Sequence, residues 1–101
     1  MRAGHTGSVF DLEVLRSEVR RRESGWAAKG LDVTLSDSPT DRDKRSSWVT
    51  VHGPAGEGVL IVWDSGEAEE ETLTTARHHD GMTTAEMLAA LDRVALAALG
   101  S

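Results

Sequence analysis

The fold is decided by the stretch Val59-Leu60-Ile61-Val62-Trp63-Asp64-Ser65-Gly66. Five consecutive apolar residues, 59–63, lie between a glycine and a polar turn. β-Branched and aromatic side chains suit the pleated surface of a strand better than a helix. A run that is apolar on both faces indicates a strand in the middle of a sheet. We therefore predict that residues 59–63 form the central strand, with Ile61 nearly fully buried.

Three further strands are predicted around this run, at residues 31–35, 48–52 and 68–77. Their side chains alternate between two faces, which is the period of a half-buried strand. In the strand 48–52, Val49 and Val51 share one face, while Trp48 and His52 share the other. A glycine-rich turn at 53–58 joins this strand to the central one as a hairpin. Residues 36–47 form a long polar loop that proline interrupts.

Two amphipathic helices are predicted at the ends of the chain. The first spans 8–28, with Ser8 as N-cap and Gly30 as its stop. The second spans 83–99, where Thr83 and Glu86 form a capping box and Gly100 ends the helix. Each helix has one apolar stripe, made by Leu12, Leu15, Val19 and Trp26 in the first and by Leu88, Leu91, Val94, Ala95, Ala98 and Leu99 in the second.

This order predicts an α+β fold: helix, four-stranded antiparallel meander sheet, helix. Strands that follow one another, with helices at both ends, favour a layer of helices on one sheet face. We therefore expect both helices on the same face. Residues 1–7 are expected to be a disordered tail, and 8–101 a single α+β domain.

Composition excludes several classes of partner. The 101 residues include 17 acids and 11 bases, a net charge of −6. Nucleic acids and anionic membranes attract basic surfaces, so neither is an expected partner. The chain has no cysteine, no apolar run of membrane length and no apolar core of a signal peptide near its start. We expect a cytoplasmic protein that is a monomer or weak dimer.

No catalytic, metal or cofactor motif stands out. The cluster that could bind a metal is His78-His79-Asp80 together with His52. Adjacent histidines on a strand or turn point apart, however, which argues against a shared ion. Gly53, Gly56 and Gly58 lie in a hairpin, without the lysine and helix of a phosphate loop. The sequence therefore predicts no catalytic residue, no metal ligand and no cofactor, so we expect the protein not to be an enzyme.

An acidic stretch is the main candidate for binding a partner. It comprises Asp64, Glu67, Glu69, Glu70 and Glu71, with no base between them. Clustered acids speed the encounter with a basic partner, although a solvated sheet edge is the alternative interpretation. Trp48 and Trp63 are candidate interface anchors, or else core residues. Asp41 and Arg42, in the loop 36–47, complete the candidate binding residues.

Several segments together resemble the TriTu-type immunity proteins of bacterial polymorphic toxin systems. They are Leu35-Ser36-Asp37-Ser38-Pro39-Thr40-Asp41-Arg42, Ser47-Trp48-Val49 and 60–69. The resemblance covers residues 10–99 and implies a cytoplasmic, non-enzymatic protein that binds and neutralises a cognate toxin. It implies further that this toxin is an ADP-ribosyltransferase that uses NAD. A small acidic secretion or effector chaperone is the first alternative, and a small enzyme of unknown reaction is the second.

Overall fold

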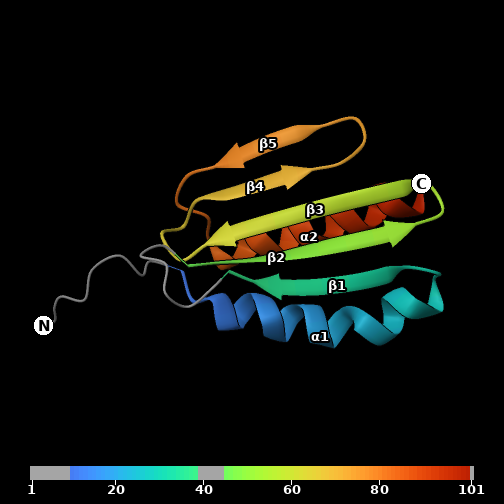
Figure 1. The fold of residues 1–101 in the computed structure, drawn as a ribbon, viewed down its shortest axis with the longest axis horizontal. Helices are drawn as coiled ribbons and strands as arrows, with labels where there is room; N and C mark the ends of the chain where they lie inside the picture. The colour runs from blue at the N-terminus through green and yellow to red at the C-terminus, as the bar shows by residue number, and fades with distance from the viewer. Residues whose placement is uncertain (1–9, 39–44, 101) are drawn as a thin grey trace, which may run out of the picture.

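The central strand of the sheet is the one expected from the apolar run. In the computed structural model, which describes residues 10–38 and 45–100, that strand is β3, Gly56–Trp63. The chain order is α1 (Leu12–Ala28), β1 (Asp32–Asp37), β2 (Ser46–Gly53), β3, β4 (Ala68–Glu71), β5 (Ala76–His79) and α2 (Thr84–Leu99). The strands form an antiparallel meander in the order β1-β2-β3-β4-β5 (Figure 1). The predicted α+β class is confirmed.

The sheet has five strands instead of the predicted four. The segment expected to be one strand, 68–77, is a hairpin: Glu71 pairs with Ala76, and the Thr72 N–H donates to the Thr75 carbonyl at 2.9 Å. The hydroxyl groups of Thr72 and Thr75 lie 2.8 Å apart and close the same turn. No glycine or proline marks this turn, which is why the sequence did not reveal it. As a consequence, His78 and His79 lie in β5 and not in a turn.

Helix α1 begins four residues later than predicted. Its N-cap is Asp11, whose side chain accepts a hydrogen bond of 2.9 Å from the Glu13 N–H. Ser8 therefore does not cap the helix, and it lies, with the expected tail 1–7, outside the described residues. The predicted apolar stripe is confirmed by the buried residues of the helix, Leu12, Leu15, Val19 and Trp26.

Helix α2 agrees with its sequence signals at both ends. Thr83 and Glu86 form the predicted capping box, and Gly100 ends the helix in the left-handed conformation at φ 88°. The buried side of α2 is made by Met87, Ala90, Leu91, Val94, Ala95 and Ala98. Of the predicted stripe, Leu88 and Leu99 are only partly buried. Met82 is buried just ahead of the cap.

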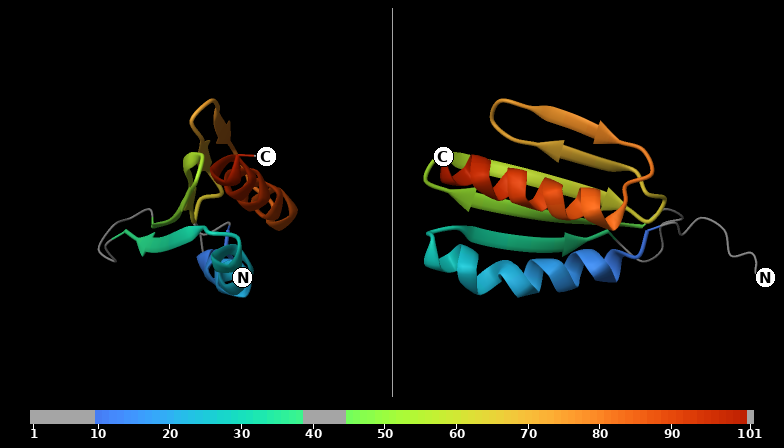
Figure 2. Two further views of the ribbon diagram at one scale, coloured as in Figure 1. Left: turned by 90° about the vertical axis from the view of Figure 1, so that its right-hand side faces the viewer. Right: turned by 180° about the vertical axis from the view of Figure 1, so that it is seen from behind.

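Both helices lie on the same face of the sheet, as predicted (Figure 2). The core between the layers contains Val49 and Val51 of β2 and Leu60 and Val62 of β3, all without exposed area. The expectation for Ile61 is wrong: its side chain points to the opposite face and is only half-buried. An apolar run does not show which of its two alternating sets faces the helices, because side chains alternate strictly along a strand.

Glycine sets the distance between α2 and the sheet. A Cβ atom at Gly58 of β3 would lie 2.6 Å from Val94 Cγ1 and 3.0 Å from the Val94 carbonyl oxygen. The absence of a side chain at Gly58 therefore lets the helix backbone approach the centre of the sheet. Within 10–38 and 45–100, no helix combines the length and hydrophobicity needed to cross a bilayer.

Candidate functional site

No described helix covers the second face of the sheet, here called the open face (Figure 2). Strand pairing aligns Trp48, Ile61 and Glu69 side by side across β2, β3 and β4. Directly paired residues share a face, so all three side chains lie on the open face. Trp63 lies two residues from Ile61 and shares that face. Both tryptophans are half-buried, so each retains accessible surface.

The acidic stretch divides between different surfaces. Glu69 and Glu71 of β4 line one side of the open face, and Glu67, just ahead of β4, lies close to His78 of β5; we call these three residues the acidic margin. Glu69 and Glu71 pair with Ile61 and Val59, respectively. The open face thus has an apolar centre bordered by acids, an arrangement that resembles the apolar core and polar rim of protein interfaces. Asp64 points elsewhere and lines a cleft beside the start of α1.

Glu70 does not face water, contrary to the expectation for the acidic stretch. It is 1% exposed and lies beneath α2, where its carboxylate accepts two hydrogen bonds of 2.7 Å from Arg93. His79 Nε2 lies 3.1 Å from the same carboxylate. Burial alone raises the pKa of Glu70, but the hydrogen bonds from Arg93 and His79 outweigh it and lower the pKa below its usual value. Glu70 therefore joins the hairpin β4–β5 to α2.

The three histidines within the described residues lie in separate environments. His78, the cross-strand partner of Glu69, is on the open face, whereas the neighbouring His79 points to Glu70. The two ring nitrogens of His78 contact Glu69 and Asp80, and these carboxylates raise the pKa of the imidazole. His52 is at the other end of the sheet, 3.8 Å from Glu57. The prediction that adjacent histidines point apart is confirmed.

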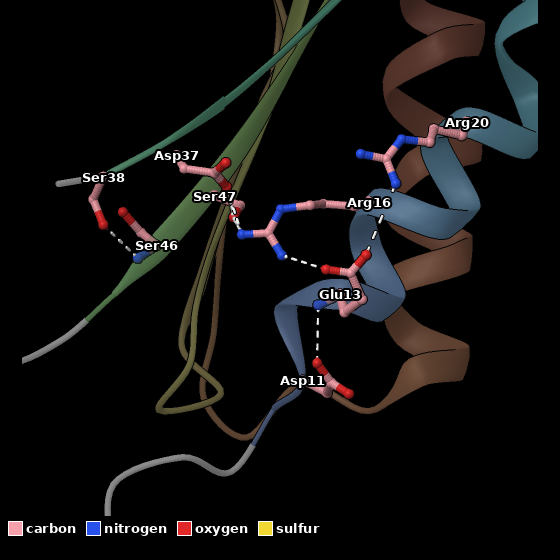
Figure 3. Close-up of polar contacts among 8 residues, drawn as sticks. All are labelled: Asp11, Glu13, Arg16, Arg20, Asp37, Ser38, Ser46 and Ser47. Carbon is pink, nitrogen blue, oxygen red and sulfur yellow. Dashed lines mark hydrogen bonds and ion pairs between the residues drawn. The ribbon is translucent and has the colours of Figure 1, made fainter. Parts of the chain in front are cut away.

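A cleft of about 410 Å³ lies beside the N-terminus of α1, where Arg45 and Asp64 line it. The sequence also proposed Asp41 and Arg42 as binding residues. Those two candidate residues lie outside the described residues. Arg16 lies at the centre of a polar network that connects α1 to β1 and β2 (Figure 3). Its guanidinium donates to Glu13 at 2.9 Å and to Asp37 at 2.8 Å, and it lies 3.4 Å from the Ser47 hydroxyl.

Arg16, the cation on the α1 side of this cleft, is paired with Glu13 and Asp37. Hydrogen bonds from Ser47 and Arg16 lower the pKa of Asp37, and the partnership raises the pKa of Arg16. Ser47 is fully buried, so the network connects the first turns of α1 to the β1–β2 pair. This arrangement fits a structural link between helix and sheet better than a binding site for a charged ligand.

The sequence identified both tryptophans and three of the acids on the open face, but missed four neighbours. Val59, Ile61 and His78 join that face through strand pairing, and Asp80, just after β5, contacts His78. Their place on this face depends on the register of β3, β4 and β5. That register could not be predicted, because the turn at Thr72–Thr75 contains neither glycine nor proline.

A comparison with known families gives a match over most of the chain. A model described as "Immunity protein TriTu" matches residues 13–95, which include every helix and strand described above except the ends of α1 and α2. Neither a curated protein nor a solved structure matches the chain.

Proposed function

The chain belongs to the TriTu family of immunity proteins, and from this we propose that it binds and neutralises a cognate protein toxin through its open face. The observation that carries this proposal is the composition of the open face, which no described helix covers. That face combines an apolar centre, formed by Trp48, Ile61 and Trp63, with the acidic margin. Tryptophan is a preferred anchor in protein interfaces. The acids would attract a basic surface and increase the rate of encounter.

We propose further that the protein acts as a non-enzymatic inhibitor. The resemblance implies a toxin that uses NAD to modify its target, and a pocket for the NAD pyrophosphate requires positive charge. The acidic margin is complementary to such a pocket. Inhibition would then be steric and electrostatic, because the open face occludes the cleft that the dinucleotide needs.

The test is the association rate with the cognate toxin domain, sought first among the neighbouring genes. The variant carries Glu67→Gln, Glu69→Gln and Glu71→Gln, and leaves Glu70 intact because that residue holds α2. We expect association at low salt to slow by about tenfold, with a weaker dependence on ionic strength. The matched control, Glu13→Gln/Glu23→Gln/Asp92→Asn, removes the same charge from the helices and should associate at nearly the wild-type rate.

The outcomes separate the parts of the proposal. Equal rates for the two triple variants would show that the acidic margin is only a solvated edge. Failure of the wild-type chain to bind or inhibit that toxin would contradict the neutralising role itself. Stopped-flow mixing at two ionic strengths gives the rates, and thermal melts establish that both variants remain folded.

One observation favours the alternative of a secretion chaperone. A groove of about 370 Å³ lies between the hairpin β4–β5 and the C-terminal half of α2, lined by Leu96, Ala97 and several threonines. Leu96 is 52% exposed, and an apolar groove of this kind suits an extended peptide. Leu96→Asp should abolish binding if the groove is the site, whereas an open-face inhibitor should bind its toxin unchanged.

A further inference from the structure

Four ionisable side chains meet on the open face at the end of the hairpin β4–β5 nearest the β3–β4 turn. Glu69 and His78 are direct cross-strand partners. Glu67 lies just ahead of β4 and Asp80 just after β5, each two residues from its neighbour in this pair. Three carboxylates and one imidazole therefore gather at this end of the hairpin.

Three of these residues place possible ligand atoms close to one another. One atom each from Glu67, His78 and Asp80 lies within 4.8 Å of the other two. His78 Nε2 and Asp80 Oδ1 are 2.9 Å apart. Two ligand atoms with metal bonds of about 2.0–2.2 Å are roughly 3–3.5 Å apart on one ion, so His78 and Asp80 would need to separate only slightly to hold one. Glu67, whose carboxylate accepts a hydrogen bond of 3.1 Å from the Ser65 hydroxyl, would exchange that contact for the ion.

Glu69 supports this arrangement from outside the set of ligands. It contacts His78 Nδ1, the ring nitrogen that does not face Asp80. In protein metal sites a ligating histidine commonly donates its other N–H to a carboxylate, which fixes the ring orientation and the tautomer. Glu69 therefore directs His78 Nε2 toward Asp80.

We propose that Glu67, His78 and Asp80 bind a divalent transition-metal ion, with Zn²⁺ as the best match, and that Glu69 positions the imidazole. One imidazole nitrogen with carboxylate oxygens is a donor set that Zn²⁺ accepts, whereas Mg²⁺ and Ca²⁺ prefer oxygen alone. This proposal departs from the prediction of no metal ligand, which rested on the divergence of two adjacent histidines. The site needs only one, and its other ligands come from positions that pairing of the strands brings together.

The site is open to solvent, since Asp80 is 82% exposed. Water would occupy the remaining coordination positions, so the ion is expected to exchange readily. This binding is a property of the chain alone and does not depend on the toxin.

The test is titration of the metal-free protein with ZnCl₂ in a non-coordinating buffer, followed by calorimetry and by the ¹⁵N resonances of the imidazoles. We expect saturable binding of a single ion, with the largest shift at His78 Nε2. His78→Gln and Asp80→Asn should each weaken binding at least tenfold, and Glu69→Gln by about 10–100-fold. His52→Gln, which changes the histidine beside Glu57, is the matched control and should bind as the wild type does.

Unsaturable binding by the wild-type chain would overturn the proposal. So would His78→Gln with wild-type affinity, or resonance shifts centred on His52. Equal affinity for Glu69→Gln would overturn the positioning role of Glu69. Asp80→Asn changes an exposed side chain, so its result does not depend on whether the fold tolerates the loss of His78.

Discussion

Glu70→Gln should lower the free energy of unfolding by about 2–3 kcal/mol at neutral pH. Removing one partner of a buried ion pair costs about 3–5 kcal/mol, because the other charge stays behind without compensation. The Arg93 side chain is 38% exposed, so water can partly solvate its guanidinium after the change. The glutamine also keeps the size of the glutamate and one hydrogen-bond acceptor. Both effects place the expected loss at or below the lower end of that range.

Urea denaturation measures this loss, and the neighbouring Glu71→Gln is its matched control. Glu71 is exposed on the open face and should change the unfolding free energy by less than about 0.5 kcal/mol. A second check is the pair Glu70→Leu/Arg93→Leu, whose total cost should be smaller than the sum of the two single changes. Equal stabilities of Glu70→Gln and Glu71→Gln would refute the view that Glu70 joins the hairpin to α2.

The same residue makes a prediction for pH. The folded pKa of Glu70 is lowered, so its ionised form is favoured by folding. That stabilisation is present above the unfolded pKa of about 4.3 and is lost as the pH falls through the folded value. The stability difference between wild type and Glu70→Gln should therefore narrow below about pH 4. A difference that stays constant from neutral to strongly acidic pH would contradict the pairing with Arg93.

Two further changes test the core by urea denaturation. Leu91→Ala should cost about 2–5 kcal/mol, because Leu91 is fully buried at the centre of the α2 stripe, and an unchanged midpoint would show that the stripe does not form the core. Gly58→Ala should cost about 1–3 kcal/mol, because the new methyl group would meet Val94. Its control is Gly25→Ala in α1, where the new Cβ would meet nothing within 4 Å. This substitution should stabilise the helix by about 0.5–1 kcal/mol.

The parts of the fold that the sequence predicted depend on local physics. The ends of α2 follow from Thr83, Glu86 and Gly100, whose side chains or backbone conformation satisfy groups that the helix itself leaves unpaired. The faces of β2 follow from the alternation of Val49 and Val51 with Trp48. Such signals operate within a few residues, so they can be recognised without knowing the rest of the structure.

The parts that the sequence missed depend on partners far along the chain. Nothing near Glu70 shows that Arg93 lies above it, and nothing near Ile61 shows which face of β3 the helices cover. The candidate site has the same character, because Trp48, Ile61, Glu69 and His78 become neighbours only through the register of four strands. The sequence could therefore supply the types of residue in the site but not their grouping.

The inward position of Glu70 bears directly on the open face. Side chains of β4 alternate, so Glu69 and Glu71 face solvent only while Ala68 and Glu70 face the helices. A slip of one residue would bury Glu69 and Glu71 beneath α2, where Arg93 could compensate only one of them. The bidentate contact between Glu70 and Arg93 therefore favours a single register of the hairpin. Glu70 and Arg93 lie on the helix side of the sheet, away from the expected toxin surface. By favouring one register, they nevertheless keep the acidic margin on the open face, where we expect the toxin to bind.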